Sequence, residues 1–75
     1  MLRAKLTRDD LTEASYDLKE AVLTVSFSDG SVFHHDHAKE TDFNSIIASE
    51  HPSREYEHGF LPRYERDRAR RVMRM

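Results

Sequence analysis

Large apolar side chains recur at every second position in the middle of the chain, which is typical of a β-strand with one buried face. This pattern covers residues 21–27, and residues 28–31 then supply the Asp and Gly that favour a tight turn. Residues 32–35 predict the returning strand. The side chains expected on the buried face are Leu23, Val25 and Phe27. Together these residues predict a β-hairpin.

The segment before the hairpin shows the same pattern in a weaker form. Residues 11–16 alternate less cleanly, and the polar residues 17–20 can turn the chain into the hairpin. We therefore expect an antiparallel β-hairpin, or a three-stranded sheet if this segment pairs with it.

The apolar spacing changes to that of a helix after the hairpin. Phe43, Ile46 and Ile47 fall at positions i, i+3 and i+4, so they share one side of a helical turn. Thr41 or Asp42 precedes them and can accept the N-cap hydrogen bonds. A short helix is predicted here.

Breaker residues divide the rest of the chain. Pro52 should interrupt the first helix, and a second short helix is predicted over residues 53–58. Gly59 can end that helix and Pro62 marks another break. Residues 64–74 are then good helix formers, so the C-terminus is expected to be an arginine-rich helix.

The pattern as a whole predicts an α+β fold: the hairpin or three-stranded sheet packed by two short helices, with the arginine-rich helix at the end. At 75 residues we expect a single domain over 1–75, with a compact core at about 11–65 and a basic tail at 66–75. A core of this size rarely supplies more than about 3–5 kcal/mol of net stability.

Cysteine usage and hydropathy bear on the location of the protein. The sequence has no cysteine, whereas secreted domains of this size usually carry disulfides. No apolar run is long enough for a signal peptide or a membrane-spanning helix. We therefore expect a cytoplasmic protein that does not enter a membrane.

The net charge of −2 hides a strong segregation of charge along the chain. Residues 1–8 carry +3, residues 9–62 carry −9, and residues 63–75, called the basic segment below, carry +4. Such a distribution can orient a partner even though the net charge is small.

The basic segment contains the candidate binding residues. A helix through it would form an arginine stripe able to contact phosphates, with an aromatic ring at its start for stacking on bases. The candidates are Arg63, Tyr64, Arg66, Arg70, Arg71 and Arg74. Glu65 and Asp67 neutralise part of this charge, so a solvated helix face is the alternative. Docking of the apolar residues Val72, Met73 and Met75 on an acidic protein surface is a third interpretation, and the sequence does not separate it from phosphate binding.

Histidines near the end of the hairpin are the candidates for a metal site. On a strand, His35 and His37 would lie on the same face and could share one zinc ion, although further ligands would be needed. The simpler interpretation is that His35 packs over the helices and its neighbours are solvated. We predict neither a metal nor a cofactor.

The sequence offers little support for catalysis. It has no cysteine, no glycine-rich phosphate loop and no nucleophile elbow, and only two glycines are present to build an anion cradle. A core this small also leaves little room for a cleft that could desolvate catalytic groups. We predict that the chain is not an enzyme.

The order of these motifs resembles the KTSC domain, a small module found at the C-terminus of some lysyl-tRNA synthetases and as short bacterial and phage proteins. The matching positions are Leu23-x-Val25-x-Phe27, Asp29-Gly30-x-Val32-Phe33-x-His35 and Tyr56-x-x-x-Phe60-x-x-x-Tyr64. The chain departs from the family in having His35 in place of a second tyrosine, and in lacking the proline after the return strand. The resemblance implies a compact α+β fold with the aromatic residues in or beside the core, and a link to RNA or translation. It implies no catalytic residues.

These observations favour a non-catalytic binding module that associates with nucleic acid, RNA in particular, through the basic segment. The alternative is a protein-binding module, such as a small phage-encoded inhibitor, that presents its acidic body to a nucleic-acid-binding protein. A thin core is also compatible with a homodimer formed through the hairpin edge or the C-terminal helix.

Overall fold

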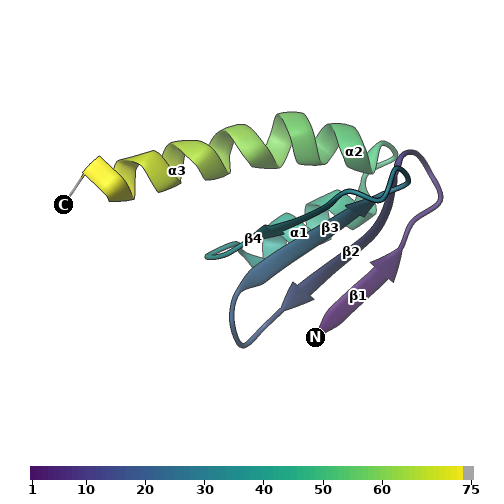
Figure 1. Cartoon of the computed structure of the whole chain (residues 1–75), viewed down its shortest axis with the longest axis horizontal. Helices are drawn as coiled ribbons and strands as arrows, with labels where there is room; N and C mark the ends of the chain where they lie inside the picture. The colour runs from purple at the N-terminus through teal and green to yellow at the C-terminus, as the bar shows by residue number, and fades with distance from the viewer. Residues whose placement is uncertain (74–75) are drawn as a thin grey trace.

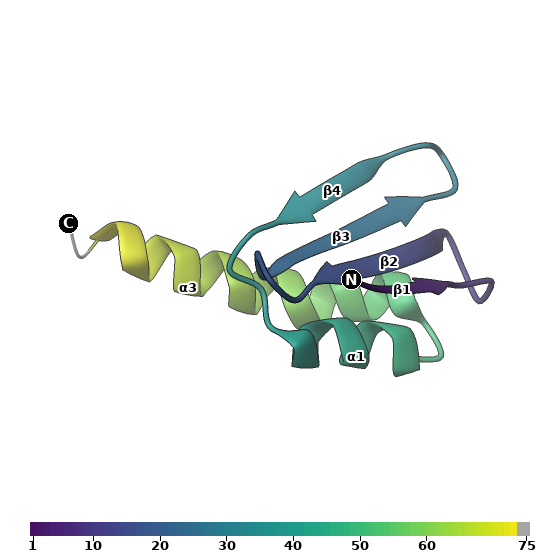
Figure 2. The same cartoon turned by 90° about the horizontal axis from the view of Figure 1, so that it is seen from below.

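The computed structural model describes residues 1–73, and the side chains up to Asp67. It contains one four-stranded antiparallel sheet, and all helices lie on the same face of that sheet (Figures 1 and 2). The strands, in their order across the sheet, are β1 (Leu2–Lys5), β2 (Leu11–Asp17), β3 (Val22–Phe27) and β4 (Val32–His35). The helices are α1 (Glu40–Ala48), α2 (Pro52–Arg54), the π-helical stretch η1 (Glu55–Phe60) and α3 (Leu61–Met73). The predicted α+β class is confirmed.

The predicted hairpin is confirmed as β3 and β4. The Phe27 amide donates to the Ser31 carbonyl at 2.9 Å, and Asp29 Oδ1 accepts from the Ser31 amide at 2.9 Å. Gly30 has φ +93°, a left-handed conformation that glycine adopts without steric cost. The turn residues therefore set the register in which Val25 faces Phe33 and Leu23 faces His35.

The strand over residues 11–16 is also confirmed, as β2, but the sheet has one strand more than predicted. β1 pairs antiparallel with β2, and Leu2, Ala4 and Leu6 pack against the core. Contacts with the core therefore begin before residue 11. The N-terminal strand is only four residues long and alternates small apolar with charged side chains, so its signal in the sequence is weak.

The predicted breaks at Gly59 and Pro62 are wrong, because the chain stays helical from Pro52 through Met73. The reason lies in η1, where the Leu61 amide donates to the carbonyl of Tyr56, five residues back. This wider turn changes the hydrogen-bond pattern just before Pro62, the residue that cannot donate. The helix therefore continues through Pro62 instead of ending before it.

The predicted N-cap of the first helix is also wrong. The helix α1 begins at Glu40 with Lys39 in the capping position, two or three residues earlier than Thr41 or Asp42 would place it. Asp42 instead sits at the third helical position and accepts a hydrogen bond from the Lys39 amide at 3.1 Å. The Asp42 side chain thus provides a hydrogen-bond acceptor for the Lys39 amide, which has no partner within the helix.

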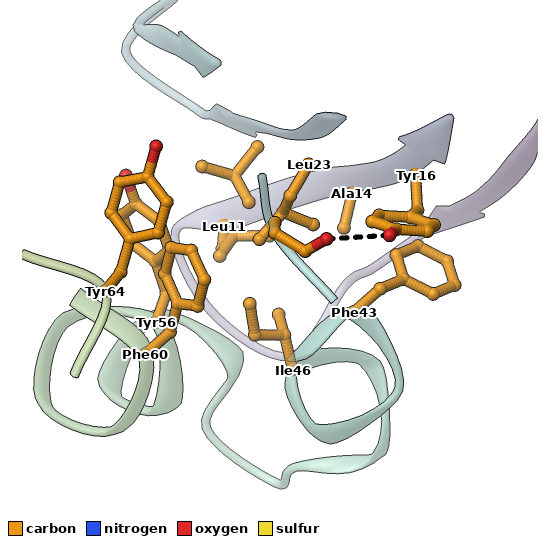
Figure 3. Close-up of a cluster of buried hydrophobic side chains, with 11 residues drawn as sticks. Leu11, Ala14, Tyr16, Leu23, Phe43, Ile46, Tyr56, Phe60 and Tyr64 are labelled. Carbon is orange, nitrogen blue, oxygen red and sulfur yellow. Dashed lines mark hydrogen bonds between the residues drawn. The ribbon is translucent and has the colours of Figure 1, made fainter. Parts of the chain in front are cut away.

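The core lies between the sheet and the helices (Figure 3). Leu11, Leu23 and Ile46 are fully buried at its centre. The Tyr16 hydroxyl donates to the Ala38 carbonyl at 2.7 Å, so the one polar atom of this buried ring has a partner. The expectation that Phe33, Tyr56, Phe60 and Tyr64 lie in or beside the core is confirmed: the last three are buried, whereas Phe33 is largely exposed and only borders the core through Phe27 and Tyr56.

A single carboxylate ties the β1–β2 loop to the start of the long helix. Asp9 Oδ1 accepts from the Leu11 amide at 3.0 Å. Asp9 Oδ2 accepts from the Ser53 amide at 3.0 Å and from the Ser53 hydroxyl at 2.8 Å. Asp9 therefore caps the N-terminus of α2 from a distant part of the sequence.

Asp9→Ala is expected to lower the free energy of unfolding by about 1–2 kcal/mol, the usual cost of losing a helix cap. The matched control is Asp10→Ala, an exposed neighbour whose loss should change stability by less than about 0.5 kcal/mol. Urea unfolding followed by circular dichroism measures both variants. Equal effects of the two substitutions would contradict the capping role.

The same carboxylate makes part of the stability depend on pH. Burial alone would raise the pKa of Asp9, but the hydrogen bonds from Leu11 and Ser53 outweigh burial and lower it. A lowered pKa stabilises the fold above the unfolded-state value of about 3.9, and this stabilisation is lost as the pH falls through the folded-state value. The difference in stability between wild type and Asp9→Ala should therefore shrink below about pH 4.

Candidate nucleic-acid interface

The helix α3 carries the predicted binding residues away from the body of the protein. It starts above the sheet and continues past the sheet's end, so that its C-terminal part projects alone (Figure 1). The longest dimension of the molecule, 41 Å against 25 and 22 Å in the other directions, reflects this projection. None of the helices within residues 1–73 is long and apolar enough to cross a membrane.

Arg63 lies at the root of this projection and is tied to the body. Its Nη2 is 3.1 Å from Asp42 Oδ1, which links α3 to the start of α1. The guanidinium remains partly exposed, so this surface ion pair contributes little to stability. Asp42 nevertheless neutralises part of the Arg63 charge, so Arg63 is a weaker candidate for phosphate contact than the sequence suggested.

Tyr64 is placed in the core, not on the surface. Its side chain is 8% exposed, and its ring stacks on Phe60 at 5.1 Å between centroids. Its hydroxyl lies 2.8 Å from the Asp36 carbonyl and 2.9 Å from Asp36 Oδ1, so it donates its proton to that residue. Because the ring is buried and also contacts His35 at 5.1 Å between centroids, it offers no open face on which a base could stack.

The remaining candidates lie further along the basic segment. The Arg66 side chain is exposed. Arg70 and Arg71 belong to α3, but their side chains are outside the part of the chain that the structure describes, and so is the whole of Arg74. Among the candidates whose side chains the structure describes, Tyr64 is buried, Arg63 pairs with Asp42 and Arg66 is exposed.

The histidines are not arranged as the metal hypothesis expected. The strand β4 ends at His35, and His37 follows in a turn with φ +59°, so the two do not share a strand face. His35 packs on the rings of Phe60 and Tyr64, with its Nε2 2.6 Å from the Tyr56 hydroxyl. His37 is exposed, with Nδ1 3.3 Å from Asp36 Oδ2. Within the described residues, no three His, Asp or Glu side chains are close enough together to hold one ion.

A hollow of about 150 Å³ lies between the start of α1 and the root of α3. It is smaller than the roughly 300–1,000 Å³ of typical ligand pockets, so it can take a few waters or a small ion. Cationic, acidic and hydroxyl side chains line it together. The lining residues, with Phe60 as the apolar member, are His37, Lys39, Thr41, Asp42, Phe60, Arg63, Tyr64 and Asp67. Sequence analysis could not find this hollow, because its two halves lie about twenty residues apart in the chain.

The stacked rings of Tyr56, Phe60 and Tyr64 form an aromatic cluster at the root of α3, and one of its phenols has a strongly raised pKa. Burial raises the pKa of Tyr56 to about 12, and the nearby carboxylates of Glu57 and Glu65 act in the same direction. Burial raises the pKa of Tyr16 as well. Both phenols therefore stay neutral across the physiological range, and Tyr56 serves as a hydrogen-bond partner for His35.

We expect the stability of the protein to fall as the pH rises above about 10, the ordinary pKa of tyrosine. The unfolded chain releases the Tyr56 proton there, whereas the folded chain keeps it until about pH 12. Absorbance at alkaline pH follows phenolate formation, and Tyr56→Phe should remove one of the late-ionising groups. Ionisation of every tyrosine near pH 10 in the folded protein would contradict this environment.

No family model matches the chain, and neither does any curated protein or solved structure.

Proposed function

We propose that this chain is a small non-catalytic binding module that holds a nucleic acid, RNA in the first place, through its basic segment. The observation that carries the proposal is the projection of α3, which continues as a helix to Met73, past Tyr64, the last buried residue among those whose side chains are described (Figure 1). Residues 66–75 hold five arginines and one aspartate. A projecting helix of this composition can approach a phosphate backbone without bringing the acidic body close to it.

The charges of the body support this division of roles. Residues 9–62 carry −9, and several of their acids are exposed. Two cations of the N-terminal segment, Arg3 and Arg8, are engaged at the surface by other groups of the same chain. Arg8 Nη1 donates to the carbonyls of Ile47 and Ser49 at the end of α1, and Arg3 pairs with Glu13 at 3.4 Å. The body repels phosphates, so the projecting end is the favourable point of contact.

The resemblance to KTSC domains agrees with an RNA partner, and the lack of cysteine in the sequence agrees with a place in the cytoplasm. Such a module needs no catalytic groups. The helix supplies charge, while the sheet and the aromatic cluster hold the root of the helix in a fixed direction.

The test is a titration of the purified chain into a fluorescently labelled single-stranded RNA at several salt concentrations. About four phosphate contacts on a single strand predict a roughly 50-fold loss of affinity between about 0.05 and 0.2 M salt. Affinity that does not change with salt, or no binding at low salt, would contradict the proposal.

A second candidate function follows from the acidic body. Exposed acids on several elements could take the place of phosphates on the surface of a nucleic-acid-binding protein, as an inhibitor would. Capture from lysate with and without nuclease separates the two. Captured material lost on nuclease treatment supports the nucleic-acid module, whereas one stoichiometric protein that survives nuclease supports the inhibitor.

A further inference from the structure

The two edges of the sheet differ in how well they are protected against another strand. The outer strand β1 carries Arg3 and Lys5, both exposed, and charged side chains of this kind discourage pairing with a further strand. The opposite edge, β4, has the sequence Val-Phe-His-His and no Lys, Arg, Asp or Glu. Figure 2 shows β4 at the side of the molecule away from α1, with no element beyond it. Only this edge is open to a partner strand.

The open edge also exposes two large apolar side chains. Val32 is 51% exposed and Phe33 is 45% exposed. They point to opposite faces of the sheet, since they are adjacent on one strand. Phe33 belongs to the helix-covered face and touches the core, with its ring 5.9 Å from Phe27 and 6.5 Å from Tyr56. The aromatic part of the core therefore extends to the β4 edge, where the Phe33 ring is left partly exposed to solvent.

The backbone register shows which groups of β4 point outward. The Phe27 amide donates to the Ser31 carbonyl, and antiparallel ladder bonds recur at every second residue. Phe33 and His35 consequently turn their amides and carbonyls toward β3. Val32 and His34 turn theirs away from the sheet, where a further strand could pair with them.

We propose that β4 pairs antiparallel with β4 of a second copy of this chain, across a two-fold axis at Phe33, so that two four-stranded sheets become one. In this register Val32 of each copy faces His34 of the other. The amide and carbonyl of both residues, four groups in each copy, then find hydrogen-bond partners in the other copy. The two Phe33 rings meet at the axis as a non-hydrogen-bonded pair, the closest type of cross-strand pair. Each ring then continues the aromatic core of its own copy into that of the other.

The charges beside β4 favour a second copy in antiparallel orientation. Asp29 lies in the turn before the strand, and His37 and Lys39 follow the strand. The proposed register brings Asp29 of one copy opposite His37 of the other, at both ends of the interface. A parallel arrangement would place like ends together. The self-pairing also enlarges a core that is thin for a domain standing alone.

The first test is the mass of the full chain by sedimentation equilibrium across a range of concentrations. Wild type should approach twice the monomer mass of 8.8 kDa. Val32→Lys and Phe33→Lys should each weaken the dimer by roughly tenfold or more, because each places a charge at the interface. The matched control is Leu18→Lys, which changes a side chain that is 55% exposed in the β2–β3 turn and should leave the dimer intact. Circular dichroism checks that all variants are folded.

The second test fixes the register. The chain has no cysteine, so one introduced thiol reports on one position. Phe33→Cys should form an intermolecular disulfide under mild oxidation, because the two residues at the axis have the short Cα separation that a disulfide needs. Leu18→Cys should not, and His34→Cys should crosslink much more slowly because each His34 faces Val32 of the other copy.

Three outcomes would overturn the proposal. If the wild-type chain stays monomeric, β4 does not pair with a second copy, and an extended segment of another protein becomes the candidate partner of this edge. A dimer that survives Val32→Lys and Phe33→Lys would lie elsewhere on the surface. Faster crosslinking at His34→Cys than at Phe33→Cys would place the two-fold axis at another residue.

Discussion

A quadruple variant of the basic segment is expected to bind single-stranded RNA roughly 100-fold or more weakly than the wild type near 0.1 M salt. The substitutions are R66Q, R70Q, R71Q and R74Q. Each removes one charge able to displace a counterion from a phosphate, while glutamine keeps the helix propensity of the segment high. The dependence of affinity on salt should nearly vanish at the same time. Fluorescence anisotropy over a series of salt concentrations measures both quantities.

The matched control removes the same number of positive charges from the body. Its substitutions are K5Q, K19Q, K39Q and R54Q, all at exposed positions. This control should keep most of the affinity and most of the salt dependence, because the charges it removes lie away from the projecting end of α3. If both variants lose affinity equally, binding follows the overall charge of the chain and not the basic segment.

Ile46→Ala is expected to leave much of the protein unfolded at 37 °C. The side chain is fully buried between α1 and the sheet, and truncation of such a residue costs about 2–5 kcal/mol. A core of this size has only about 3–5 kcal/mol of net stability to lose. Thermal and urea unfolding followed by circular dichroism measure the loss.

The neighbouring residue supplies the control for this prediction. Ile47→Ala makes the same chemical change one position along α1, where the side chain is only partly buried. We expect about 1 kcal/mol of destabilisation and a folded protein, since less area is lost from contact with the core. Equal losses at both positions would contradict the assignment of Ile46 as the more deeply buried contact, because replacing Ile by Ala raises helix propensity at both positions alike.

Unfolding and loss of binding should be separable in these experiments. The four substituted arginines follow Tyr64, the last buried residue among those whose side chains the structure describes, so their replacement should leave the unfolding midpoint nearly unchanged. Ile46→Ala should do the reverse and destabilise the sheet and helices without removing any charge. This contrast distinguishes a defect in the interface from a defect in the fold.

The sequence by itself determined the α+β class, the hairpin and its turn, the strand before it and the first helix. These elements follow from local rules: alternation of apolar residues, a glycine in a left-handed turn, and helical spacing of Phe43 and Ile46. The uneven distribution of charge was also readable without a structure, because it depends on composition alone.

Tertiary structure decided the rest, because contacts between distant residues outweighed local preferences. Pairing with β2 made a strand of residues 2–5, and a π-helical turn carried the helix through Gly59 and Pro62. For the candidate site, a hydrogen bond to Asp36 and packing against Phe60 placed Tyr64 in the core, although its position beside the arginines had suggested a stacking surface. The apolar edge at β4 likewise became visible only once the order of the strands was known. Helix propensities differ by a few tenths of a kcal/mol among most residues and cost about 1 kcal/mol for Gly and about 3 kcal/mol for Pro. Burial of each large side chain contributes about 1.5–3 kcal/mol, so the summed packing of several side chains prevails where the two disagree.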